Sequence, residues 1–277
     1  MSFKWEDMKM IKYFVTLSFI FVYGLTFANT NAKTLELEIA KVVRAPLFVE
    51  SVLDQYGLHG MPRQVIKEHF LEIYKNNEVI EVIVKELLNA GAEKWDKKTQ
   101  FEYGRKFGAE LFLTYALKGM RRLDYQDQRS YIKLMLNWME VASDIDCKKL
   151  IVEGGKTSAS EDSDLEMKYY HLIEKEILRN YFLILRKSIL AEIRDFPSVR
   201  NINQQQASIA ESAYESRLLS RVESGLIDYK MLEAMIDLPN ADPKLACSAG
   251  KQIFATILSL DGFVGDLFLL KFINSLQ

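Results

Sequence analysis

One stretch constrains the fold of this chain more than any other: residues 163–196, where apolar side chains recur at the three- and four-residue spacing of an α-helix. Ser163 and Glu166 have the S-x-x-E spacing of a capping box, which predicts that a helix starts there. Pro197 predicts the stop, because the residue before a proline is displaced from helical geometry. The pattern therefore predicts one helix of about nine turns, about 50 Å long. Residues 181–185 are apolar on every side, so we expect other helices to cover this one from several directions.

The remaining chain also follows the helical period rather than the alternation of a strand. Its apolar segments begin after helix-start signals such as Asp124 and the pair Asp242-Pro243, and they end at glycine or asparagine. Residues 79–84 (VIEVIV) form the one β-prone run, but their flanks keep the helical period. We therefore predict an all-α fold: an irregular bundle of about ten helices packed around the long central helix at 163–196.

The sequence contains one polar, Gly/Ser-rich connector of any length, at residues 153–162. It separates a group of predicted helices at 33–152 from a second group at 161–277. No repeat with a fixed period of roughly 20–50 residues is visible, so the pattern does not predict a solenoid. We expect a single domain with two lobes rather than two independent domains.

Residues 1–32 have the organisation of a secretory signal peptide. A short basic segment from Met8, which is an alternative start of translation, precedes an apolar run at 13–27. Small residues follow the run, so cleavage after Ala28 or after Ala32 fits the pattern. The run is shorter than the about 20 residues of a spanning helix, which disfavours an uncleaved membrane anchor. We expect a periplasmic or secreted protein with no stable membrane insertion after cleavage.

The charge composition excludes some partners. The chain has 36 Lys+Arg and 38 Asp+Glu, a formal net charge of −2, and neither a basic excess nor an acidic tail. A nucleic-acid-binding domain normally carries a basic patch or stripe and a high pI. We therefore expect a protein partner and no nucleic acid.

The two cysteines, Cys147 and Cys247, lie in the part of the chain expected to be exported. An even number of cysteines in an oxidising compartment predicts a structural disulfide, here one that closes a loop containing the whole 163–196 helix. Two buried free thiols are the alternative. The sequence has no C-x-x-C motif, so thioredoxin-like redox chemistry has no support.

No motif in the sequence predicts catalysis or a cofactor. The segment LIVEGGKT ends like a phosphate-binding loop, but Leu150 occupies the position of the first glycine of that motif. Glu68, His69 and Glu72 lie within one helical turn and could hold a metal or act as acid and base, although such triplets are usually solvated faces. Ser248 has no identifiable His or Asp partner.

The remaining histidines, His59 and His171, form no H-E-x-x-H or other i,i+4 pair of metal ligands. We therefore predict no catalytic, metal or cofactor residues and no cofactor. The resulting hypothesis is an exported, non-enzymatic helical binding protein, a periplasmic inhibitor or immunity-type protein that acts by tight contact with a toxin or envelope hydrolase. An envelope assembly or scaffolding factor is the alternative, and a peptidoglycan-acting hydrolase is a third class.

Overall fold

The structure is a computed structural model, and it describes residues 32–91, 111–152, 165 and 167–275. Within these ranges the regular secondary structure is helical and no strand occurs, which confirms the all-α prediction. Residues 111–120 are also helical. The other elements are α1 (Ala32–Val43), α2 (Pro46–Gln55), α3 (Gly60–Tyr74), α4 (Asn77–Asn89), α6 (Tyr125–Val141), α7 (Asp144–Val152), η3 (Tyr170–Leu172), α9 (Lys175–Ile193), α10 (Gln204–Glu223), α11 (Tyr229–Ile236), α12 (Pro243–Leu258) and α13 (Gly262–Asn274).

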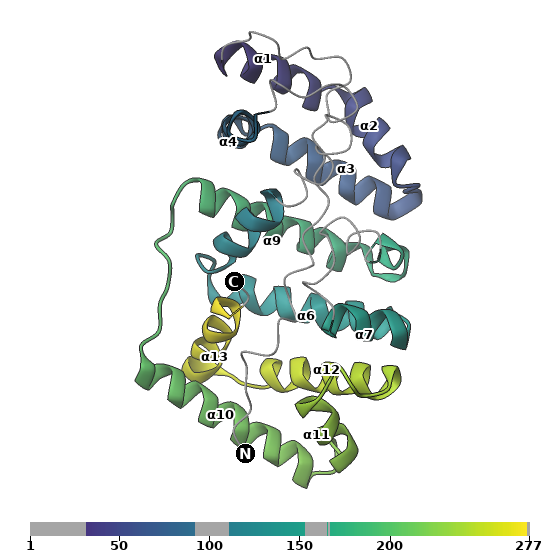
Figure 1. The fold of residues 1–277 in the computed structure, drawn as a ribbon, viewed down its shortest axis with the longest axis vertical. Coiled ribbons are helices and arrows are strands. Elements are labelled where there is room, and N and C mark those ends of the chain that lie inside the picture. Colours follow the sequence, from purple (N-terminus) through teal and green to yellow (C-terminus); the bar gives the residue numbers. More distant parts are fainter. Residues whose placement is uncertain (1–31, 92–110, 153–164, 166, 276–277) are drawn as a thin grey trace.

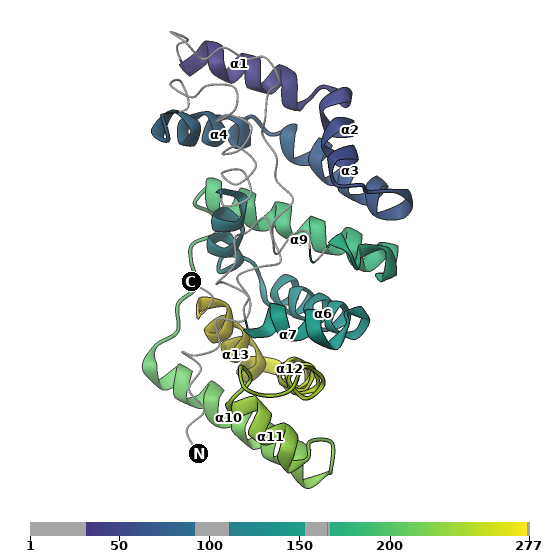
Figure 2. The same ribbon diagram turned by 45° about the vertical axis from the view of Figure 1, so that its right-hand side comes forward.

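The helices are stacked in successive layers along one long axis (Figure 1). The helices α1 and α4 pack together at one end, α3 follows, and α9 lies between α3 and α6. Beyond α6, the helix α12 packs on both α6 and α7, and α10 and α11 occupy the other end, where they pack on α13 and α12. A view from another side shows the same order (Figure 2). Because each layer covers the next, buried apolar side chains run along the whole stack.

The predicted continuous helix at 163–196 is wrong in its length. The residues of its predicted capping box lie outside the described part of the chain. Within the described part, η3 is followed by Ile173 and Glu174 in non-helical conformation, with ψ of 137° and 140°, and α9 begins only at Lys175. The break lets Tyr169 and Tyr170 both turn into the interior, where each is at least 94% buried. An apolar period alone does not distinguish this arrangement from one uninterrupted helix.

The end of α9 also differs from the prediction. The backbone N–H of Phe196 donates to the carbonyl of Ala191, and that of Asp195 donates to Glu192. With Asp195 at φ 51°, this is a Schellman motif in which aspartate occupies the left-handed position usually taken by glycine. The helix therefore ends at Ile193, and Phe196, the last apolar residue of the predicted pattern, is exposed.

The middle of α9 is covered from several directions, as its apolar composition predicts. Its buried side chains are Leu178, Tyr181, Phe182, Ile184, Leu185, Ser188, Ile189 and Ala191. A close approach occurs at Gly119, in the helical segment 111–120, where an added Cβ would lie 1.7 Å from the carbonyl oxygen of Ser188. Glycine at this position therefore permits direct contact between two helix backbones.

Several predicted helix starts are confirmed. Asp124 accepts a hydrogen bond from the backbone N–H of Asp127 at 2.8 Å and caps α6. Asp242 accepts from the N–H groups of Lys244 and Leu245, and Pro243 is the first residue of α12. These are local interactions between a cap and the next three residues, which explains why the sequence predicts them.

The packing of α9 also bears on how the two halves of the sequence are arranged. Although α9 belongs to the predicted second lobe, it packs on α3, α4 and α6, which all belong to the first. The predicted connector at 153–162 lies outside the described residues, as do residues 1–31 of the predicted signal peptide, so the lobe boundary and the cleavage point remain predictions.

Candidate functional site

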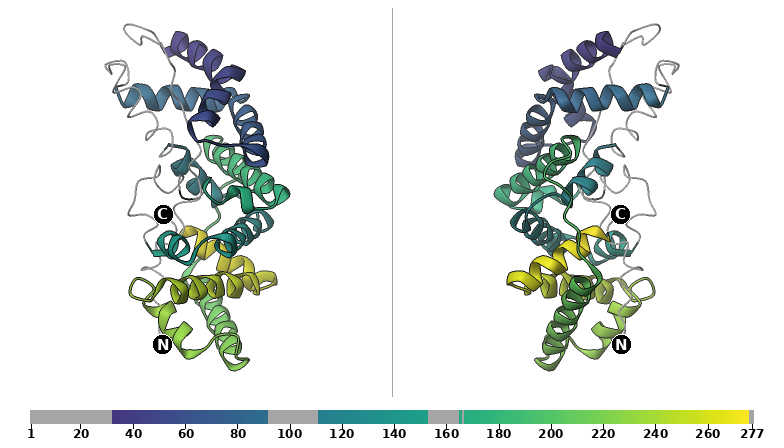
Figure 3. Two further views of the ribbon diagram at one scale, coloured as in Figure 1. Left: turned by 90° about the vertical axis from the view of Figure 1, so that its right-hand side faces the viewer. Right: turned by 90° about the vertical axis from the view of Figure 1, so that its left-hand side faces the viewer.

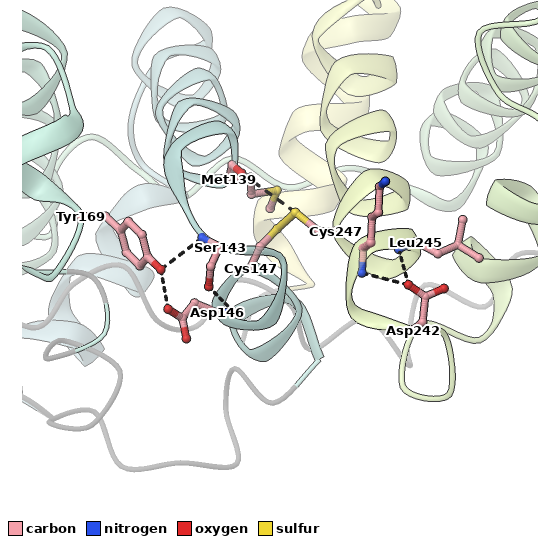
Figure 4. Close-up of a disulfide and its surroundings, with 9 residues drawn as sticks. Met139, Ser143, Asp146, Cys147, Tyr169, Asp242, Leu245 and Cys247 are labelled. Carbon is pink, nitrogen blue, oxygen red and sulfur yellow. Dashed lines mark hydrogen bonds between the residues drawn. A yellow bond between two sulfur atoms is a disulfide. The ribbon is translucent and has the colours of Figure 1, made fainter.

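The two cysteines lie at the centre of the contact between α7 and α12 (Figure 4). Cys147 and Cys247 are joined in a disulfide, with 5.5 Å between their Cα atoms and 100 residues between them in sequence. Both side chains are fully buried. The bond therefore connects two helices that already share a packed interface.

Small residues bring the two helices together at this interface. Gly250 lies three residues after Cys247, on the same face of α12, and Ile151 lies four residues after Cys147 on α7. A Cβ added at Gly250 would lie 2.3 Å from Cδ1 of Ile151. The absence of a side chain at Gly250 lets α7 approach closely enough for the two sulfur atoms to meet.

A polar cluster lies beside the disulfide, at the junction of α6 and α7 (Figure 4). The buried carboxylate of Asp146 accepts hydrogen bonds from the hydroxyl of Tyr169 and from Nζ of Lys168, the latter at 2.8 Å. The Tyr169 hydroxyl also accepts from the backbone N–H of Ser143 at 3.1 Å. Its ring packs edge-on against Trp138, with 5.3 Å between ring centroids.

These contacts keep the Asp146 carboxylate charged. Burial raises its pKa, but the hydrogen bonds from Lys168, Tyr169 and Ser143 outweigh this effect, so the pKa is lower than that of a free aspartate. A carboxylate whose lone pairs are engaged by neighbouring side chains is a fixed structural acceptor. The cluster holds Lys168 and Tyr169 at the α6–α7 junction, which is consistent with the chain leaving helical geometry just before α9.

The triplet of Glu68, His69 and Glu72, considered from the sequence as a metal or acid–base site, is not assembled into one site. His69 points inward and is 3% exposed, with 4.8 Å between its ring centroid and that of Phe182. Its Nδ1 atom has no hydrogen-bond partner. Burial, with a smaller contribution from the positive charge of Arg186, lowers the pKa of His69 to about 3, so its imidazole is neutral near pH 7.

The two glutamates of the triplet face away from this histidine. Glu68 forms an ion pair with Arg179 of α9 at 3.3 Å, and Glu72 pairs with Lys75 on its own helix. Half-exposed pairs of this kind contribute little to stability, typically below about 1 kcal/mol. The solvated-face interpretation of the glutamates agrees with this geometry, whereas His69 is a core residue.

The other sequence fragments are also dispersed. Leu150 is buried in α7, and residues 153–157 of the glycine-containing fragment lie outside the described residues. His59 precedes α3 and His171 lies in η3, both exposed, while Ser248 is half-buried on α12. Within the described ranges, no three His, Cys, Asp or Glu residues are grouped so that they could hold a metal ion. In the same ranges, no helix is both long and apolar enough to cross a membrane.

One network around a buried arginine was not predicted from the sequence. The guanidinium of Arg122 donates to Glu192 at 2.8 Å, to Asp195 at 2.5 Å and to the carbonyl of Pro197 at 2.9 Å. Although arginine is usually exposed, the side chain of Arg122 is only 9% exposed. It fixes the chain after α9, and nothing in the sequence around Arg122 indicates partners 70 or more residues away.

Comparison of this chain with models of protein families, with curated proteins and with solved structures gives no match.

Proposed function

We propose that this chain is an exported, non-enzymatic binding protein, a periplasmic inhibitor or immunity-type protein that occupies a toxin or an envelope hydrolase by direct contact. The observation that carries the proposal is the buried disulfide between α7 and α12. Disulfides persist in oxidising compartments and are rare in the reducing cytosol, so this bond agrees with the signal-peptide pattern of residues 1–32.

The stacked helices support a binding role. An elongated array of helices presents a large outer surface relative to its core, and helical arrays commonly use such surfaces for protein recognition (Figures 1 and 2). The disulfide and the Arg122 network hold distant parts of the chain in fixed positions. A rigid surface lowers the entropy lost on association, which favours tight binding.

Export can be tested first. The full chain is expressed in a bacterium, the cells are fractionated, and thiols are labelled with a maleimide-polyethylene glycol that slows migration on a gel. We expect a shortened, periplasmic protein that is labelled only after reduction. Cys147→Ala is the control, because its single remaining thiol should be labelled after denaturation without a reductant. An intact precursor in the cytoplasm with both thiols reactive would overturn the assignment of compartment.

Binding is then tested with the purified mature protein as bait against the envelope of its own cells and against proteins secreted by neighbouring strains. We expect one dominant partner with nanomolar affinity, and inhibition of that partner's activity on addition of the chain. Deletion of the gene should sensitise cells to strains that secrete the partner. Unchanged survival of the deletion strain beside such competitors would contradict an immunity role.

A further inference from the structure

The end of the stack formed by α10 and α11 differs in chemistry from the rest of the molecule. Both side views show these helices, drawn in green, at one extreme of the long axis (Figure 3). They pack inward on α13 and α12. Four large apolar side chains on this end are more than half exposed: Leu219 58%, Leu226 56%, Tyr229 77% and Ile236 54%.

Acidic side chains alternate with these apolar residues along the outer faces of both helices. On α10, Glu223 follows Leu219 by four residues, and on α11, Glu233 lies between Tyr229 and Ile236 at helical spacing. The turn that contains Leu226 connects the end of α10 to the start of α11. We call these six residues (Leu219, Glu223, Leu226, Tyr229, Glu233 and Ile236) the acidic end surface.

This end of the stack carries a net negative charge. Residues 204–238 contain three Lys+Arg and six Asp+Glu, a net of −3, so the remaining residues contain 33 Lys+Arg and 32 Asp+Glu. Among these six acids, only Glu211 forms an ion pair within the described part of the chain, with Lys271. The other five are exposed and outnumber the exposed cations Arg217 and Lys230 on the same helices, which leaves a net negative field.

The opposite end of the stack, residues 32–91, also exposes apolar side chains, and it contains seven Lys+Arg and nine Asp+Glu, a net of −2 over 60 residues. Leu47 on α2 is 84% exposed, yet the nearby carboxylates of Glu50 and Asp54 both form ion pairs with Arg63. Exposed apolar area by itself therefore does not distinguish the two ends. The α10–α11 end differs in its exposed aromatic side chain, Tyr229, and in its denser negative charge, a net of −3 over 35 residues.

We propose that the acidic end surface is the contact surface for a positively charged protein partner, with Tyr229 as its central anchor. The proposal rests on the binding function proposed above and identifies where that binding occurs. Protein interfaces enclose exposed aromatic residues within a polar rim, and complementary charge speeds association and selects the partner. A second copy of this chain is disfavoured as the occupant, because a symmetric contact would place two surfaces of net charge −3 against each other. An anionic membrane is disfavoured for the same reason.

The test places the photo-crosslinking amino acid p-benzoylphenylalanine at position 229 in the full chain, expressed in its own cells, with position 47 as the control site. We expect a cross-link to one different protein from position 229 and none from position 47. In the same chain, E223K/E233K should reduce the cross-link at least tenfold, because it reverses two rim charges. E81K/E140K, which makes the same charge change at exposed positions on α4 and α6, should change it less than twofold.

The possible outcomes test the acidic end surface and the proposed binding function separately. A partner that is captured from the envelope but cross-links only from position 47 overturns the acidic end surface and leaves the binding function standing. A cross-link from position 229 to a second copy of the chain overturns it in favour of a dimer. Co-sedimentation with phosphatidylglycerol vesicles that is lost in Tyr229→Ala overturns it in favour of a membrane. Absence of any partner in both the envelope capture and the cross-linking overturns the binding function as well.

Discussion

Removal of the disulfide is expected to lower stability by about 3–5 kcal/mol. The bond closes a loop of 100 residues in sequence. In the chain-entropy model, a loop of that length corresponds to about 4.7 kcal/mol, because the cross-link restricts the unfolded chain. In the folded state, Gly250 still packs against Ile151, so the interface between α7 and α12 keeps most of its contacts when the sulfur atoms are replaced. The cost should therefore come mainly from the unfolded state.

The measurement is urea unfolding of the oxidised mature protein and of the double variant Cys147→Ala/Cys247→Ala. Helix content is followed by circular dichroism at about 222 nm. We expect a lower midpoint and a larger m-value for the double variant, because an unfolded chain without the cross-link exposes more surface. The reduced wild-type protein should agree with the double variant within about 1 kcal/mol. Ser248→Ala, a half-buried neighbour on α12, is the control and should change stability by less than about 0.5 kcal/mol.

A specific result would refute this reasoning. If mass spectrometry shows the bond in the wild-type protein and the double variant is nevertheless within about 1 kcal/mol of it, then the unfolded chain is already restricted without the disulfide. The bond would then not be the main link between the α7 and α12 parts of the chain.

Three further predictions follow from buried residues. Gly119→Ala should destabilise the protein by about 2–4 kcal/mol in thermal unfolding, because the new Cβ meets the backbone carbonyl of Ser188, which cannot move aside. Gly250→Ala should cost clearly less, because its Cβ meets the side chain of Ile151, which can move. Equal costs would contradict this distinction. The pKa of His69 is lowered in the folded state, so the unfolded state binds the additional proton as the pH falls, and the free energy of unfolding should decrease by about 2 kcal/mol between pH 7.5 and pH 5. This pH dependence should disappear in His69→Phe. If it persists in the variant, other groups cause it. Arg122→Met should cost about 1–2 kcal/mol, measured by urea unfolding, because the partly buried Glu192 carboxylate and two exposed acceptors lose the donor that joins them, and a loss below about 0.5 kcal/mol would show that water replaces it.

Much of the helical structure is predictable from short-range chemistry. The starts of α6 and α12 depend on Asp124 and Asp242, each of which binds backbone N–H groups within three residues of itself. Such interactions are complete within one turn, so the residues that make them are adjacent in the sequence. The apolar period likewise predicted much of the buried face of α9, including Leu178, Phe182 and Ile189, although Leu183 and Phe196 of the same pattern are exposed.

The break before α9 could not be predicted in this way. Tyr169 is held by Asp146, which lies 23 residues earlier on a different helix, and that contact competes with continuation of the helix. Local propensity favoured helix through this segment, and tertiary hydrogen bonding overrode it. The burial of His69 could not be predicted locally either, because its ring packs against Phe182, a residue more than 100 positions away. Glu68 and Glu72 on the same helical turn remain at the surface.

The amino-acid sequence alone determined the all-α class, the helix starts and the pair of cysteines available for a bridge, because each depends on local spacing or on a simple count. Only the tertiary structure decided that α7 and α12 face each other across Gly250, that Arg122 is buried beside acceptors far away in the chain, and that Tyr229 is exposed at one end of the stack. These features depend on which helices become neighbours. The apolar periodicity of the sequence predicts which face of a helix is buried, but it does not predict which other helix packs against that face.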